Sequence, residues 1–357
     1  MSEFIQSKAR AEIFNLKPYV PGKPIEVQRE LGIDDIIKLA SNENPLGPSP
    51  LGKNAFKGLM DKLHIYPDAN CFKLKQKLSE LLDCDPQGLL IGNGSDELLK
   101  LLAETFLNSG DEIIFAQPSF AEYEFTATIM GATSVKVPLI DFKHDLEAML
   151  AAVNPHTKMV YICNPNNPTG TIVTAEEIDS FMARVPQDVL IIFDEAYASG
   201  VKYVKDGRNA VVLRTFSKIY GLAALRVGYG VTTPDIAAAV ERVTEPFNVN
   251  TPAQVAATAA LDDKEHLEQS RKVNQAGKNY LYEEVEKLQL KYLKTDANFI
   301  FIDTGKDSQE VFQRLLKQGV IIRSGDIFGY PTYIRVTVGN EKENARFIES
   351  LKKILGV

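Results

Sequence analysis

The chain has 357 residues, of which 45% are hydrophobic and 24% are charged, and its formal net charge is −7. This length suits two domains, or one large domain with a smaller one beside it. The acidic balance argues against nucleic acid as the main partner, because binding a phosphate backbone needs concentrated Lys and Arg. A small anionic ligand in a local pocket remains compatible with this composition.

Cysteine and histidine usage argues against disulfides and metal ions. Cys71, Cys84 and Cys163 are an odd number, scattered through apolar or helical segments, which favours a reducing compartment. The four histidines lie far apart and none is near a cysteine pair, so we expect no metal site. The N-terminal stretch has no apolar core of signal-peptide length, and no later segment approaches a membrane span. We therefore expect a cytoplasmic protein that does not bind membranes.

The first part of the chain is predicted to be irregular. Three prolines fall between Lys17 and Pro24, which forbids a helix and favours an extended arm lying on the rest of the protein. The passage from Ser41 to Pro48 stays irregular, and Tyr66-Pro67-Asp68 is expected to close a short helix. An amphipathic helix is predicted from Phe72 to Leu82.

From Leu89 onward, short apolar strands alternate with helical patterns. The predicted strands begin at residue 89 and then cover 112–115, 134–137, 159–163, 189–193, 211–213 and 227–231; the helices between them cover about 95–107, 121–130, 146–153 and 175–184. Strands that are apolar throughout and alternate with helices predict an α/β fold with a mostly parallel sheet, here seven-stranded, covered by helices on both faces.

After about residue 250 the pattern becomes that of a small α+β unit. The expected elements are a long polar-faced helix over 262–287, strands at 299–302, 320–323 and 333–338, and helices at 309–317 and from 341. No low-complexity linker separates the two units, so we expect a helix shared by both at the boundary. The predicted organisation is an arm with part of the small domain over 1–40, a large domain over 41–250 and a small C-terminal domain over 251–357.

One polar motif starts a predicted helix. A glycine turn, Gly92-Asn93-Gly94, precedes Ser95-Asp96-Glu97, where free amides and the helix dipole attract an anion. The motif is neither a Walker motif nor a dinucleotide fingerprint, because no Gly-Lys-Ser/Thr follows and the third glycine is absent. A phosphate without a nucleotide is the simplest ligand.

Other polar residues follow the predicted strands. Asn164 to Gly170 is rich in turn residues, but it lies at the carboxyl end of a parallel strand, where open α/β sheets bind ligands. Asp194 directly follows four apolar residues, and a buried aspartate must be neutralised or paired with a cation. Lys218 comes after a third strand, with Arg226 eight positions on. Taken alone, such a lysine is most often an exposed one.

Five residues together carry a family resemblance. Asn167, Asp194, Tyr197, Lys218 and Arg226, in this order and local context, resemble the fold type I pyridoxal phosphate enzymes of the aspartate aminotransferase superfamily. Within it, residues 17–24, 41–45 and 92–97 are similar to the histidinol-phosphate aminotransferase branch. That branch transfers the amino group between L-histidinol phosphate and 2-oxoglutarate by a ping-pong reaction in histidine biosynthesis. The implied cofactor is pyridoxal 5'-phosphate (PLP).

The resemblance gives each of these residues a role. Lys218 would bind the cofactor aldehyde as a Schiff base and then carry the substrate proton, which needs an amine of lowered pKa. Asp194 would pair with the pyridine nitrogen, while Tyr197 and Asn167 would bind the phenolic oxygen of the ring. The residues implied for the cofactor phosphate and ring face are Arg226, Thr215, Ser217, the amides of Ser95 and Asp96, and Phe120 over the ring, with Tyr123 as the alternative.

Substrate binding and assembly follow from the same resemblance. Arg335 is flanked by Ile334 and Val336 and must point out of the small-domain core; it would clamp the carboxylate of the amino donor glutamate, with Asn167 beside it. Arg323 would add charge for the substrate phosphate, and Tyr19 would close over the site from the arm. Tyr66 resembles a tyrosine that reaches the cofactor phosphate of a neighbouring subunit, which implies a homodimer with shared active sites.

Three other functions stay open. Imidazole and phenyl rings are similar in size, so an aromatic amino acid aminotransferase is one alternative. A phosphothreonine decarboxylase of the same fold is another. A non-catalytic PLP-sensing regulator would normally need an attached DNA-binding unit, and the N-terminal residues are too few and too rich in proline to supply one.

Overall fold

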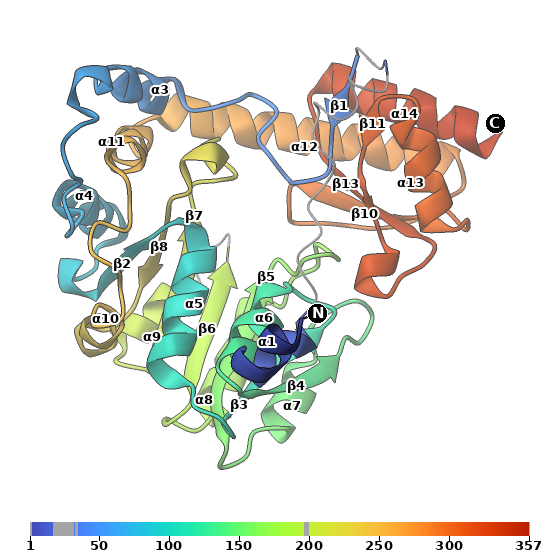
Figure 1. Cartoon of the computed structure of the whole chain (residues 1–357). Helices are drawn as coiled ribbons and strands as arrows, with labels where there is room; N and C mark the ends of the chain where they lie inside the picture. Colours follow the sequence, from blue (N-terminus) through green and yellow to red (C-terminus); the bar gives the residue numbers. More distant parts are fainter. Residues whose placement is uncertain (1, 17–31, 33–34, 196–199, 357) are drawn as a thin grey trace.

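The computed structural model describes residues 2–16, 32, 35–195 and 200–356. The predicted arm at 17–24 with Tyr19, and the predicted ring contact Tyr197, lie outside these residues. The described chain forms a large α/β unit around a seven-stranded sheet and a smaller α+β unit beside it (Figure 1).

The large sheet is parallel except for one strand. Its order is β2 (Leu89–Gly92), β8 (Gly228–Val231), β7 (Ala210–Thr215), β6 (Leu190–Glu195), β5 (Thr157–Asn164), β3 (Glu112–Gln117) and β4 (Thr133–Pro138). Only β8 runs against its neighbours, β2 and β7, among the strands of this sheet. The predicted fold class is confirmed, and most strands extend one or two residues beyond the predicted apolar runs because the ladder hydrogen bonds continue into polar residues.

Helices cover both faces of the sheet, as its two-sided apolar strands require. In β5, Val160 and Ile162 face one layer while Met159, Tyr161 and Cys163 face the other, which is the alternation expected of a strand. The first layer contains α4 (Phe72–Leu82), α7 (Leu146–Ala151), α8 (Ala175–Arg184), α9 (Val201–Lys205) and α11 (Thr251–Ala260). The second contains α5 (Gly94–Phe106), α6 (Glu122–Ile129) and α10 (Pro234–Val240).

Two N-terminal helices attach to this unit at its edges. The helix α3 (Pro50–Lys57) packs on α11. It ends at Lys57, and a short 3-10 turn at Met60–Lys62 follows, so the helix that we expected Tyr66-Pro67-Asp68 to close ends earlier than predicted. The 3-10 turn Ala11–Asn15, which follows the helix α1 (Glu3–Lys8), packs on α6.

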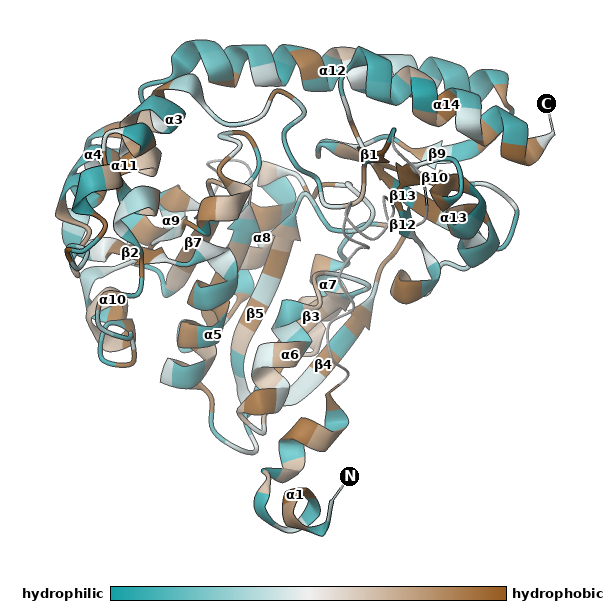
Figure 2. Cartoon of the chain, turned by 45° about the horizontal axis from the view of Figure 1, so that its top comes forward, coloured by the Kyte–Doolittle hydropathy of each residue, from teal (hydrophilic) through white to brown (hydrophobic). Residues whose placement is uncertain are grey.

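The smaller unit has an antiparallel sheet of order β12 (Arg323–Ser324), β13 (Tyr333–Thr337), β10 (Phe299–Asp303) and β9 (Lys291–Leu293). Its helices are α13 (Ser308–Leu316) and α14 (Glu341–Leu355). A short strand from the N-terminal part, β1 (Ile37–Lys38), pairs in parallel with β11 (Val320–Ile321). Figure 2 shows these strands mostly in the brown of hydrophobic residues, whereas α12 (Lys264–Lys287) is mostly teal.

The helix α12 belongs to both units. It starts near α3 and α11 and runs across to the smaller unit (Figure 1). Asp263 caps its first turn and accepts a hydrogen bond from Ser49 in the large unit, while Leu281 and Val285 enter the small hydrophobic core. The helix begins two residues later than predicted because Asp263 is used as the cap. The domain limits at 40 and 250 remain a prediction.

Candidate active site

The polar motifs lie along the carboxyl edge of the large sheet. The strand β5 ends at Asn164, β6 at Glu195 and β7 at Thr215, and because these strands are parallel their carboxyl ends lie at the same edge. The strand register places Asp194 between Cys163 of β5 and Leu213 of β7. This is the edge where open parallel sheets bind ligands.

Lys218 lies in the loop after β7 and is half-buried. Its Nζ donates a hydrogen bond to the carbonyl oxygen of Ser41, at 2.8 Å. Burial, together with the positive charge of Arg335, lowers the pKa of Lys218 to about 8. At neutral pH a larger share of this amine is therefore unprotonated than of a surface lysine, as nucleophilic attack on a carbonyl requires.

The loop of Lys218 is pressed against the segment that contains Ser41. Gly221 has φ +67°, and a Cβ atom placed on it would lie 2.1 Å from the carbonyl oxygen of Gly47. Only glycine permits this approach. Asn44 strengthens the contact, because its Nδ2 donates to the carbonyl oxygen of Ile219 at 2.9 Å. The position of the lysine is thus fixed by residues far away in the sequence.

Asp194 has a buried tyrosine as its partner. The Tyr123 hydroxyl donates to Asp194 Oδ2 at 2.7 Å. Burial raises the pKa of Asp194 to about 6, and the hydrogen bond from Tyr123 opposes this rise. Tyr123 stacks on Tyr161 with ring centroids 4.6 Å apart and meets the edge of Phe120 at 5.8 Å. The structure therefore gives Tyr123 a role that the sequence did not indicate, as the partner of the carboxylate.

The start of α5 forms a cradle for an anion. The Asn93 side chain does not cap the first turn, and its Nδ2 donates to the carbonyl oxygen of Asn248. Gly94 has φ +80°, and a Cβ atom there would lie 2.7 Å from Arg226 Nη2. A Cβ atom on Gly228 would likewise lie 2.7 Å from the Ser95 amide nitrogen. Free amides and a guanidinium around a space kept open by glycines suit a phosphate group.

Arg226 connects this cradle to the lysine loop. Its guanidinium donates to Asp96 at 3.0 Å and to Ser217 Oγ at 3.4 Å. Thr215 Oγ1 accepts a hydrogen bond from the Ser217 amide at 3.0 Å. The predicted phosphate residues from α5 and from the lysine loop are therefore brought together.

Arg335 leaves the small-domain core as predicted, but it is not exposed. Ile334 and Val336 face that core, whereas Arg335 lies between the two units with only 6% of its surface exposed. Its guanidinium donates to Asn167 Oδ1 and, at 2.9 Å, to the carbonyl oxygen of Ala40. The rings of Phe299 and Phe328 lie 5.2 and 5.4 Å from its guanidinium carbon. An arginine held in this way is oriented for a carboxylate.

Two predicted residues lie at the margins of this arrangement. Arg323 of β12 is directly opposite Arg335 in the antiparallel register, so both side chains share one face of the sheet. Tyr66 is 78% exposed and stacks on Phe247, with ring centroids 4.8 Å apart. Within one chain, the structure shows Tyr66 stacked on Phe247, and its predicted contact with a partner subunit stays a prediction.

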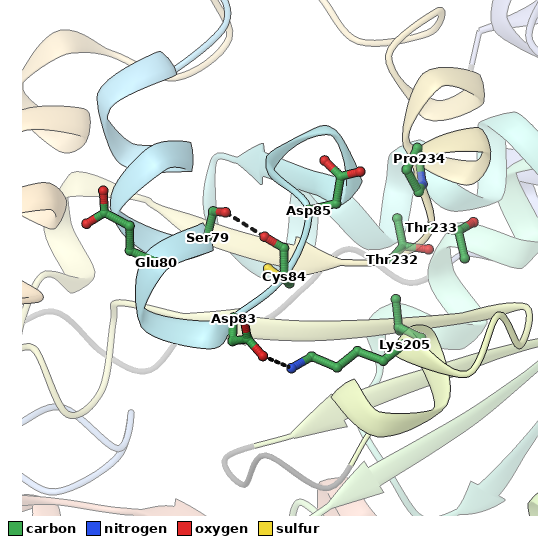
Figure 3. A pocket seen from close by; sticks show the side chains of 10 residues that line it. Ser79, Glu80, Asp83, Cys84, Asp85, Lys205, Thr232, Thr233 and Pro234 are labelled. Carbon is green, nitrogen blue, oxygen red and sulfur yellow. Dashed lines mark hydrogen bonds and ion pairs between the residues drawn. The ribbon is translucent and has the colours of Figure 1, made fainter.

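A separate open depression lies at the other edge of the large sheet (Figure 3). It has a volume of about 650 Å³ and lies where Thr232 follows β8 and Lys205 ends α9. Figure 3 shows Lys205 paired with Asp83, at 3.0 Å, and the Ser79 hydroxyl donating to the Cys84 carbonyl. None of the predicted site residues lines this depression.

Two general properties concern the described residues as a whole. Within them, no group of three or more His, Cys, Asp or Glu side chains could hold a metal ion. No helix in the described ranges is long and apolar enough to cross a membrane.

The fold and the site together are those of a fold type I PLP-dependent enzyme, as the sequence predicts. The sequence model described as aminotransferase class I and II matches residues 34–351. This chain belongs to that family.

Its similarity to individual relatives extends over nearly its whole length. A histidinol-phosphate aminotransferase from Moorella thermoacetica is 56% identical over 98% of this chain and 93% of its own. One from Caldicellulosiruptor saccharolyticus is 46% identical over 97% of this chain and 99% of its own. A crystal structure of histidinol-phosphate aminotransferase from Sinorhizobium meliloti in complex with pyridoxal-5'-phosphate superposes with a TM-score of 0.90, at 27% identity and 98% coverage of both chains.

Proposed function

We propose that this protein is a PLP-dependent aminotransferase that transfers the amino group between L-histidinol phosphate and 2-oxoglutarate. The observation that carries the proposal is Lys218, an amine of lowered pKa set between the anion cradle of Arg226 and the carboxylate clamp of Arg335. The names of relatives at 56% and 46% identity support the substrate, and the PLP complex of the Sinorhizobium meliloti protein supports the cofactor.

The residues present fit PLP in charge and shape. Arg226, Ser217, Thr215 and the free amides at Ser95 and Asp96 would hold its phosphate in the space that Gly94 and Gly228 keep open. Asp194, held by Tyr123, would face the pyridine nitrogen, and Phe120 would cover the ring. Asn167, together with Tyr197, would contact the phenolic oxygen. When bound, PLP withdraws electrons from the substrate α-carbon.

The chain's own residues would supply binding and proton transfer. Lys218 would hold the cofactor and, once released by the substrate amine, carry the proton from the substrate α-carbon, because its lowered pKa of about 8 leaves a larger unprotonated share than a surface lysine has. Arg335, with Asn167 beside it, would bind the carboxylate of glutamate or 2-oxoglutarate and fix its α-carbon near the lysine. Arg323, on the same face of the sheet, would favour a phosphorylated side chain, and Tyr19 would close over the site.

The proposed enzyme acts as a cytoplasmic homodimer with shared active sites. Apolar side chains gather on the surface just before Tyr66: Met60, Leu63 and Ile65 are each more than half exposed. Such a patch is typical of a surface covered by a second copy. Tyr66 lies at its end and would reach the cofactor phosphate of the partner. Sedimentation of a species with twice the chain mass is the expected result, and a stable monomer with full activity would refute this part of the proposal.

Steady-state kinetics tests the substrate. We expect kcat/KM for L-histidinol phosphate with 2-oxoglutarate to exceed that for phenylalanine by on the order of 100-fold or more, because phenylalanine offers no phosphate to the guanidinium of the partly buried Arg323. Phosphothreonine should release no carbon dioxide. A preference for phenylalanine would make the protein an aromatic amino acid aminotransferase, and decarboxylation of phosphothreonine would make it a phosphothreonine decarboxylase. PLP binding without turnover of any substrate would indicate a regulator.

A further inference from the structure

Asn166 lies between the two loops that carry Phe120 and Asn167. Its side chain is fully buried, with 0% of the residue exposed. Its Nδ2 donates to the carbonyl oxygen of Pro118, at 3.2 Å, in the loop after β3. The same nitrogen donates to Thr169 Oγ1, at 3.0 Å, in its own loop after β5. One amide nitrogen thus joins the ends of two neighbouring strands.

The oxygen of the same amide is also fully used. Asn166 Oδ1 accepts from Ser119 Oγ at 2.8 Å and is 3.2 Å from His144 Nε2. Because the Pro118 carbonyl can only accept, the amide orientation is fixed, and its oxygen must face Ser119 and His144. His144 Nε2 therefore carries a proton and donates it to this bond.

His144 is placed as a dedicated support for the amide. It precedes α7, is 8% exposed, and its Nδ1 makes no hydrogen bond with any described residue. A buried polar atom without a partner costs free energy, so the stabilising contact of this side chain must lie at its other nitrogen. That nitrogen contacts Asn166.

The two loops held by Asn166 are those that face the proposed cofactor from different strands. Phe120 follows Ser119 directly, and Asn167 follows Asn166 directly. The backbone closes the second loop through bonds from Gly170 N to Asn166 O, at 2.7 Å, and from Asn166 N to Thr171 O, at 2.9 Å. A loose amide at residue 166 would let both neighbours shift.

We infer that Asn166, oriented by His144, is a positioning residue that fixes Phe120 and Asn167 relative to each other, so that Phe120 covers the face of one ring while Asn167 contacts the phenolic oxygen on its edge. The inference rests on the proposed function, because it takes that ring to be PLP. It concerns neither the lysine nor the phosphate cradle. The inference predicts that PLP binding depends on a hydrogen-bond donor at position 144 and not on the volume of the side chain there.

The test compares His144→Leu, which fills the space without a donor, with His144→Gln, whose amide can again donate to Asn166. Asn344→Ala is the matched control: Asn344 is also buried and makes two hydrogen bonds, both to Gly339 in the smaller unit. Two quantities are measured: the dissociation constant of PLP, by fluorescence titration of the PLP-free protein, and backbone hydrogen exchange of that PLP-free protein.

We expect His144→Leu to weaken PLP binding about tenfold, the effect of one buried hydrogen bond, and His144→Gln to restore most of it. Exchange in the PLP-free His144→Leu protein should rise in 117–120 and 164–171 together. The inference is overturned if His144→Leu leaves both quantities unchanged, if His144→Gln is as impaired as His144→Leu, or if Asn344→Ala weakens PLP binding equally. Failure of the wild-type protein to bind PLP would instead refute the proposed function, while the exchange result would still test the role of Asn166.

Discussion

Replacing Tyr123 with Phe removes the hydroxyl that donates to Asp194 Oδ2 at 2.7 Å and leaves the stacked ring in place. A hydrogen bond to a charged group contributes about 1.5–3 kcal/mol, against about 0.5–1.5 kcal/mol for a neutral one. The ionised form of Asp194 therefore loses about 1 kcal/mol or more relative to the protonated form. Its pKa, which burial already raises to about 6, should rise by roughly one further unit.

The pKa of Asp194 is higher in the folded protein than in the unfolded chain, and this sets the direction of the pH dependence. The folded protein holds a proton on Asp194 at pH values where the unfolded chain has released it, so the contribution of Asp194 to stability falls as pH rises through the folded pKa. In Tyr123→Phe this fall continues to a higher pH. We expect the variant to be destabilised, relative to wild type, by about 1.4 kcal/mol more at pH 8 than at pH 5.

The assay is urea unfolding of the PLP-free protein at a series of pH values. Tyr161→Phe is the matched control, because Tyr161 is equally buried in the same stack but its hydroxyl faces Met159 Sδ at 3.4 Å. Other titrating groups are common to all three proteins and cancel in the differences. A Tyr123→Phe penalty that is the same at pH 5 and pH 8, or a pH-dependent penalty of equal size in Tyr161→Phe, would refute the reasoning.

Three further outcomes are expected. Arg335→Lys should raise KM for 2-oxoglutarate and for glutamate, the substrates that carry a carboxylate, by on the order of 100-fold while PLP binding stays within about twofold of wild type, because lysine cannot form the bidentate pair; an unchanged KM for 2-oxoglutarate would contradict the clamp. Gly94→Ala should weaken PLP binding at least about tenfold, since its Cβ atom would lie 2.7 Å from Arg226 Nη2, and wild-type affinity would contradict the cradle. In the PLP-free protein, acylation of Lys218 should rise with pH through about 8, because only the neutral amine reacts; a midpoint near that of a surface lysine would show that the site does not lower its pKa.

The alternation of apolar strands and helices predicts the large sheet well, because buried parallel strands leave a strong pattern in the sequence. The same pattern does not predict that β8 runs antiparallel to its neighbours. Gly228 to Val231 is as apolar as its neighbours, and the connection from β7 contains a 3-10 turn, Ala223–Leu225, but no α-helix that would carry the chain back across the sheet for a parallel strand. The end of α3 was also misplaced, because Pro67 marks an end to helix but does not say how far before it the helix stops.

The candidate site, like the fold, could be predicted only in part from the sequence. Asp194 and Arg335 could be identified as site residues from the apolar residues beside them. These neighbours imply that Asp194 is buried and needs a partner, and that Arg335 points out of the small-domain core. The partners themselves could not be named. Tyr123 is 71 residues from Asp194, and the carbonyl that binds Lys218 belongs to Ser41, 177 residues away. Contacts of such separation depend on how the strands and the two units are placed, which local patterns do not record.

The central claim is that Lys218 holds the cofactor, and reduction with borohydride tests it most directly. The PLP-loaded protein is reduced, digested and analysed by peptide mass spectrometry. We predict that the pyridoxyl phosphate group is found on Lys218 and that the protein with Lys218→Ala carries none. A label on another lysine, or its persistence in the Lys218→Ala protein, would contradict the account.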